Sequence, residues 1–240
     1  MIQNRAVLII GASGRTGVHL IQQLSTLPRS SSPRVFAFCR DPPKLDQNIK
    51  ELCHGVMQGD ARSSMDLELA LQITKADLVV VSIGNGDNVK KSNIRTESAK
   101  ALVQVLVGQR GYGHVHVLVL SMIGAGGSGG VGKLTEFHLR HVLQDHSGQE
   151  AVFLSSMKDR TLIVRPTALA ENKSIGKVVT FDSTEKFPTK KTDRKDLADW
   201  LVREAICRDW SSGRFGLKPI TVTSVKSRSR YGGMYRYRAC

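Results

Sequence analysis

Closely spaced cysteines are missing from this 240-residue sequence, which has only four cysteines and no C-x-x-C pair. They stand at Cys39, Cys53, Cys207 and Cys240. Zinc sites and disulfide frameworks need cysteines at short, regular spacings, so we expect neither. His138, His141 and His146 lie near one another, but no cysteine or carboxylate pattern accompanies them. The sequence therefore predicts a reduced, cytoplasmic protein without a metal site.

Long apolar runs, repeats and linkers are also missing. No apolar stretch approaches the length of a membrane span, and no solenoid or propeller period recurs. No stretch rich in Pro, Gly and Ser divides the chain, so we expect one domain over residues 1–225. An apolar strand is predicted from Ala6, almost at the first residue, and we expect no targeting sequence before it.

Acidic residues disappear after Asp209, although the whole chain carries a formal net charge of +14. The last stretch, SVKSRSRYGGMYRYRAC, interleaves Arg with Tyr and Gly. We expect residues 226–240 to form a flexible basic tail. Such a tail suits nucleic acid through phosphate pairing and base stacking, or an anionic surface, or simply a solvated chain end.

Glycine is concentrated near the start of the chain. The stretch AVLIIGASGRTGVHLIQQL places Gly11, Gly14 and Gly17 between a short apolar run and a helical pattern. Gly11 permits a tight turn, Gly14 allows a pyrophosphate to approach the backbone, and Gly17 allows the helix to pack closely on the strand. Backbone N–H groups at a helix start also attract phosphate. This arrangement favours a dinucleotide site over a simple strand-to-helix turn.

The rest of the chain alternates apolar strands with helical patterns. The predicted strands include RVFAFCR, HGVMQGDA, ADLVVVSIG, HVHVLVLS, TLIVRP and PITVTSV. The predicted helices include DLELALQI, SAKALVQVLVGQRG and TDRKDLADWLVREAI. This alternation predicts an α/β fold of the Rossmann type, a doubly wound parallel sheet with helices on both faces and ligands at the carboxyl ends of its strands.

A second glycine-rich stretch, MIGAGGSGGVGK, begins at Met122. It contains G-x-x-x-x-G-K, but Leu134 stands where a Walker A motif needs Ser or Thr for magnesium, so we expect a mobile lid here instead. The pattern after it predicts a helix over residues 133–156, interrupted at Ser147 and Gly148.

The ordered segments GASGRTG, FCRDPPKL, GDA, RHVLQDHSGQEAVFLSS...RTLIVRPTAL and DRKDLADWLV resemble the atypical short-chain dehydrogenase/reductase family, in particular its NmrA-like and flavin/biliverdin-reductase-like members. The likeness covers residues 6–206. It implies an NAD(P)H-binding protein in which Gly11, Ser13, Gly14, Arg15 and Thr16 surround the pyrophosphate, with Gly17 as the packing glycine.

The resemblance places further residues around the cofactor. Asp60, followed by Ala61, matches a family aspartate whose carboxylate faces the adenine amino group, although a turn or helix-cap role suits this aspartate as well. Ser82, Ile83 and Gly84 correspond to the strand end beneath the adenosine ribose. Thr167 and Leu169 then line the substrate side.

Catalytic residues are less clearly marked. Ser121 occupies the family position beside the nicotinamide and substrate, where a hydroxyl can stabilise a developing oxyanion, or it is an ordinary turn serine. The usual Tyr-x-x-x-Lys pair has no match, because Val142 and His146 stand in its place. His146 is a candidate proton donor, with a purely conformational hydrogen-bonding role as the alternative.

Cofactor choice depends on the residues after the second strand. An NAD site normally has a carboxylate there, whereas an arginine accommodates the 2′-phosphate of NADP. Arg40 comes first, at the position of the family arginine, and Lys44 and Arg15 add positive charge. Asp41 precedes Pro42 and suits a turn. We therefore expect NADP(H) in preference to NAD(H).

These patterns give two functional hypotheses. The first is an NAD(P)H-dependent oxidoreductase that transfers hydride from NADPH to a small-molecule acceptor: a flavin, quinone, tetrapyrrole or carbonyl compound. The second is a non-catalytic regulator or accessory subunit that senses the dinucleotide, which accounts for the missing catalytic pair.

Overall fold

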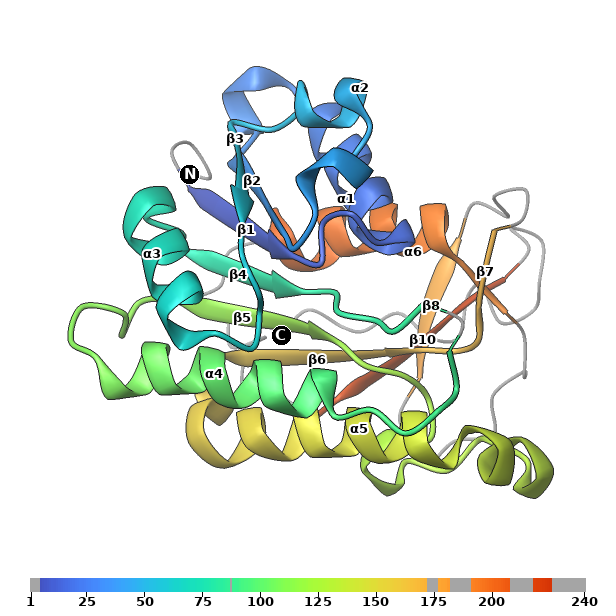
Figure 1. Cartoon of the computed structure of the whole chain (residues 1–240). Coiled ribbons are helices and arrows are strands. Elements are labelled where there is room, and N and C mark those ends of the chain that lie inside the picture. Colours follow the sequence, from blue (N-terminus) through green and yellow to red (C-terminus); the bar gives the residue numbers. More distant parts are fainter. Residues whose placement is uncertain (1–4, 87, 172–176, 182–190, 208–217, 226–240) are drawn as a thin grey trace.

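The computed structural model describes residues 5–86, 88–171, 177–181, 191–207 and 218–225. A sheet runs through the middle of the molecule in the order β3-β2-β1-β4-β5-β6-β10-β8 (Figure 1). Its strands are β1 (Ala6–Ile10), β2 (Arg34–Cys39), β3 (Gly55–Gln58), β4 (Leu78–Val81), β5 (His116–Leu120), β6 (Thr161–Pro166), β8 (Val178–Phe181) and β10 (Ile220–Ser224). Neighbouring strands are parallel except for β10 and β8.

Helices cover both faces of this sheet (Figure 1). One face carries α1 (Arg15–Ser25), the short α2 (Gln47–Lys50) and α6 (Arg194–Leu201), and the other carries α3 (Ser64–Thr74), α4 (Ile94–Gly108) and α5 (Lys133–Met157). Along β1, Val7 and Ile9 join the first core, whereas Leu8 and Ile10 join the second. The expected doubly wound Rossmann-like fold is confirmed.

Two smaller features complete the carboxyl-terminal half. The strands β7 (Leu169–Ala170) and β9 (Thr192–Asp193) pair in parallel beside the main sheet. A π-helical turn, Val202–Ile206, extends α6 and contributes to the core with Val202, Ala205 and Ile206. Since β7 directly follows β6, this extra pair lies at the end of the sheet where the predicted site is expected.

The predicted interruption of the long helix at Ser147 and Gly148 is wrong, because α5 is continuous from Lys133 to Met157. A Cβ atom at Gly148 would lie 2.4 Å from Oγ1 of Thr96, so this glycine permits close contact with α4. Ser147 donates to the carbonyl of Leu143 one turn earlier and accepts from the backbone N–H of Gly126. Both residues therefore serve packing within a helix.

The basic tail and the absence of a membrane span are also expected from the sequence. The basic tail, residues 226–240, lies outside the described residues. Among the helices that are described, none combines the length and the apolar character needed to cross a bilayer.

Candidate functional site

The turn between β1 and α1 has the geometry that its glycines predict. Gly11 has φ +84°, and a Cβ atom there would lie 2.4 Å from the carbonyl oxygen of Ser82. A Cβ at Gly17 would lie 2.6 Å from the carbonyl oxygen of Gly11, so α1 can pack on the turn only with glycine at this position. The tight turn and the packing role of Gly17 are thus confirmed.

A pocket of about 410 Å³ opens at the carboxyl ends of β1, β2, β4, β5 and β6. Most of the predicted site residues line it: Gly11, Ser13, Gly14, Arg15, Thr16, Arg40, Asp60, Ala61, Ser82, Ile83, Gly84, Ser121 and His146. Thr167 and Leu169 lie in its wall as well. Residues from seven separate stretches of the chain therefore meet in one cavity of the size that small-molecule sites have.

The two basic residues predicted after β2 have different positions. Arg40 lines the pocket and also a neighbouring hollow, which Arg62 and Lys91 line as well. Lys44 lies outside the pocket and forms an exposed ion pair with Asp41 at 3.0 Å. Asp41 begins a 3₁₀ turn at Pro42–Lys44, in agreement with its predicted turn role. Arg62 is paired with Asp60, and Glu97 also borders the hollow, so among the described residues the uncompensated positive charge at this end of the pocket comes from Arg40 and Lys91.

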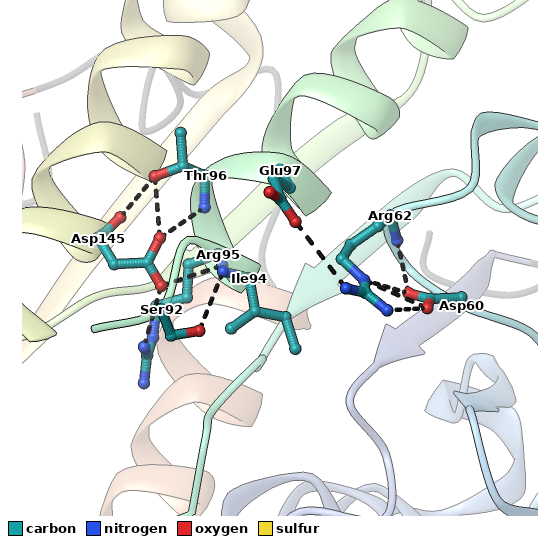
Figure 2. A network of polar contacts seen from close by, with 8 residues as sticks. All are labelled: Asp60, Arg62, Ser92, Ile94, Arg95, Thr96, Glu97 and Asp145. Carbon is teal, nitrogen blue, oxygen red and sulfur yellow. Dashed lines mark hydrogen bonds and ion pairs between the residues drawn. The ribbon is translucent and has the colours of Figure 1, made fainter. Parts of the chain in front are cut away.

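Asp60 follows β3 and is engaged by Arg62 (Figure 2). Both carboxylate oxygens of Asp60 accept from the guanidinium of Arg62, at 2.6 to 3.2 Å. These hydrogen bonds hold the pKa of Asp60 down to about 2, so the group is an ionised acceptor at neutral pH. Sequence reasoning missed Arg62, although its position two residues after Asp60 suits such a local pair.

Ser121 and His146 each line the pocket and each have a buried polar atom. Among the described residues, Oγ of Ser121 and Nδ1 of His146 are buried and have no hydrogen-bond partner. Burial, together with the positive charge of Arg95, lowers the pKa of His146 well below its usual value. His146 is consequently a neutral imidazole at physiological pH.

Arg95 and Asp145 form a buried network of polar contacts (Figure 2). The Asp145 carboxylate, on α5, accepts from the backbone N–H groups of Arg95 and Thr96 at 3.1 and 3.0 Å, and so caps the start of α4. It also accepts from Oγ1 of Thr96 at 2.9 Å and from Nη1 of Arg95 at 3.3 Å. Arg95 lines the pocket. Sequence reasoning missed this network because its partners lie about fifty residues apart along the chain.

The predicted glycine-rich lid is anchored over its first half. Ile123 donates its N–H to the carbonyl of Pro166, and Ala125 is fully buried. Gly126, with φ +57°, lies directly over a buried, two-pronged ion pair between Glu150 and Arg165, and its N–H bonds to Ser147. Only Met122 of this segment reaches the pocket.

No cluster of metal-binding side chains occurs within the residues that the structure describes. The chemistry available in the pocket is instead that of backbone N–H groups, arginines and hydroxyls around a cavity. The glycine turn offers the close backbone approach that a pyrophosphate needs, since a side chain at Gly11 is excluded and Gly14 lies beside it. The residues present thus fit a dinucleotide.

Comparison with curated proteins finds fungal relatives. Oxidoreductase AgnL4 of Paecilomyces divaricatus is 24% identical, covering 93% of this chain and 87% of that protein. Oxidoreductase tpcG of Aspergillus fumigatus is 26% identical, with 93% and 85% covered. Oxidoreductase nsrR of Aspergillus novofumigatus is 28% identical over a shorter stretch, 42% of this chain and 38% of its own length.

Solved structures share the fold at low sequence identity. The oxidoreductase ylbE from Lactococcus lactis superposes with a TM-score of 0.69 at 20% identity, covering 92% of this chain and 91% of that one. A short-chain dehydrogenase/reductase from Veillonella parvula, solved in complex with NADP, gives 0.70 at 19% identity, with 92% and 94% covered. ChuY, an anaerobilin reductase from Escherichia coli O157:H7, gives 0.71 at 14% identity, with 90% and 96% covered.

A family model described as NAD(P)H-binding matches residues 11–206, from the first glycine of the β1–α1 turn to the end of the helical extension of α6. This match confirms the resemblance inferred from the sequence motifs. The chain belongs to the NAD(P)H-binding family.

Proposed function

We propose that this protein is an NADPH-dependent reductase that delivers hydride to a small-molecule acceptor held beside Ser121. The observation that carries the proposal is the continuity of one pocket, from the glycine turn of β1–α1 to Ser121 after β5, whose buried hydroxyl has no partner among the described residues. The names of the curated relatives, all oxidoreductases, support this reaction class. A flavin, quinone, tetrapyrrole or carbonyl compound is the acceptor class that we propose.

Positive charge at the outer end of the pocket supports NADPH over NADH. Arg40 borders both the pocket and the hollow that contains Arg62 and Lys91. The first residue after β2 is Arg40 and not a carboxylate. The next residue, Asp41, precedes the Pro42–Lys44 turn and pairs with Lys44. A 2′-phosphate suits this arrangement better than a 2′-hydroxyl does.

The Ser121 end of the pocket supports hydride transfer to an acceptor that the pocket holds in position. When bound, the nicotinamide supplies the hydride. Oγ of Ser121 can donate a hydrogen bond to an acceptor oxygen on which negative charge develops. His146 is neutral and buried, so we assign it to the pocket wall and not to proton donation. The proton that the reduced acceptor needs then comes from solvent, which a flavin or quinone acceptor permits. Catalysis of this kind relies on proximity and orientation.

A second candidate function is a regulator that binds the dinucleotide without turnover. The observation that favours it is the composition of α5, where Val142 and His146 occupy the places of the usual Tyr and Lys. This function requires the same cofactor pocket but no acceptor.

A steady-state assay separates the two functions. NADPH oxidation is measured against flavins, quinones, aldehydes and a linear tetrapyrrole, and cofactor affinity is measured in parallel by titration. The reductase proposal expects turnover with at least one acceptor class. Micromolar NADPH affinity without turnover on any acceptor would favour the regulator.

A further inference from the structure

Arg95 is a buried cation that the cofactor site does not account for. It is the second residue of α4, its side chain is 9% exposed, and it lines the pocket beside Gly84 and His146. Arg15 and Arg40 come from the segments that follow β1 and β2, where a dinucleotide's phosphates are expected. Arg95 comes from the segment after β4 and places its positive charge beside His146, which also lines the cavity.

Asp145 satisfies only part of the Arg95 guanidinium. Its contact with Nη1 is 3.3 Å, long for a charge-assisted hydrogen bond, and the same carboxylate also caps the backbone of α4 and binds Thr96. Within the described residues, Nε of Arg95 is buried without a partner, and Nη2 has no hydrogen bond. Nη2 points toward Gly84, 3.9 Å from where a Cβ atom would stand.

The same chain shows what a saturated buried arginine looks like. Arg165 donates from Nε and Nη2, the side edge of its guanidinium, to the two carboxylate oxygens of Glu150. That edge is the one Arg95 leaves without a partner. Buried donors without partners cost free energy, which a ligand oxyanion at this position would offset.

We propose that Arg95 is an anchor for an oxyanion of the acceptor, a carboxylate or phosphate, so that the enzyme prefers anionic acceptors. Asp145 orients Arg95 through Nη1, which leaves Nε and Nη2 of Arg95 for the oxyanion. This inference rests on the proposed reductase function, since it names the acceptor class for the same pocket.

The test compares matched anionic and neutral probes. Binding of FMN and of riboflavin to the protein saturated with NADP⁺ is followed by flavin fluorescence, and NADPH-dependent turnover is compared for 4-carboxybenzaldehyde and benzaldehyde. We expect the anionic member to be favoured roughly 10- to 100-fold in at least one pair, as for one charge-assisted contact. Arg95→Met should reduce that ratio to near one and leave NADPH affinity within about three-fold, well below the effect of one such contact.

Two further variants keep the result interpretable. Arg95→Lys retains the charge and the contact with Asp145 but loses the forked edge, so it should lower the ratio even if Arg95→Met does not fold. Arg140→Met removes an exposed arginine of α5 outside the pocket and should leave the ratio unchanged.

Three results would overturn the proposal: no discrimination in either pair by the unmodified protein, discrimination that persists without Arg95, or a loss of NADPH affinity in place of a loss of discrimination. The last result would assign Arg95 to the cofactor. If no acceptor is reduced but FMN binding still depends on Arg95, the reductase function fails and the anion site stands.

Discussion

At the scale of single residues, Arg40 determines which dinucleotide we expect the pocket to favour. Arg40→Ala should weaken NADPH binding about 10- to 100-fold, the effect of one charge-assisted phosphate contact, and leave NADH nearly unchanged. Titration of both cofactors checks this, with Arg34→Ala, at the opposite end of β2, as the control. Equal affinities in the unmodified protein, or equal losses in the variant, would contradict the NADP assignment.

Ser121 tests the acceptor end of the pocket. Ser121→Ala should lower turnover, by up to on the order of 100-fold for a carbonyl acceptor and less for a flavin, because one oxyanion donor is lost. NADPH affinity should be unaffected. Thr221→Val is a matched control, since the Thr221 hydroxyl is also buried without a partner among the described residues but does not line the pocket. Unchanged turnover in Ser121→Ala would reduce Ser121 to a structural residue.

His146 makes stability depend on pH. Its pKa in the folded state lies below the unfolded value near 6.5, so the unfolded chain binds more protons as the pH falls below about 6.5. The unmodified protein should lose up to about 1.4 kcal/mol per pH unit more than His146→Gln between about pH 6.5 and 5. Urea unfolding across this range measures the difference. Parallel stability curves would show that His146 titrates normally in the fold.

At the scale of helices and strands, Asp145 joins α5 to the start of α4. Asp145→Ala should cost about 3 kcal/mol or more, because it removes the cap of α4 and leaves Arg95 buried without its counter-ion. Ser63→Ala, which removes an ordinary cap at the start of α3, should cost only about 1 kcal/mol. Chemical denaturation compares the two, and similar losses would mean that the Asp145 network adds little beyond capping.

The strands and the first turn could be predicted because local rules determine them. The apolar run before Gly11 and the three spaced glycines specify a strand, a turn and a packed helix without knowledge of the rest of the chain. Gly148 shows the opposite case: its sequence suggests a break, whereas its role depends on Thr96 of another helix. The contact of Asp145 with Arg95 is of the same tertiary kind, which no local pattern reveals.

The candidate site divides in the same way. Residues that follow strands, such as Asp60 and Ser121, could be placed in the pocket because the carboxyl ends of parallel strands meet at one edge. Lys44 was expected there too, but its side chain pairs locally with Asp41. Arg95 could not be anticipated, because its approach to the pocket depends on how α4 and α5 pack against each other.

At the scale of the whole molecule, the basic tail should be separable from the cofactor site. Deleting residues 226–240 should leave NADPH affinity within a few-fold, since the described residues that line the pocket already supply the glycine turn, Arg40 and the strand ends. A large loss, or an unfolded product, would show that the tail packs on the domain. If the tail binds nucleic acid, the affinity of the full chain for it should fall steeply with salt.

As a reductase, the whole molecule must transfer hydride to an acceptor as well as hold the cofactor. The most direct test is the rate of NADPH oxidation with the best acceptor of the panel, measured with ordinary NADPH and with NADPH deuterated at the transferring C4 position under single-turnover conditions. We predict that the reaction proceeds and is measurably slower with deuterium. Saturating NADPH binding with no oxidation by any acceptor would contradict the account.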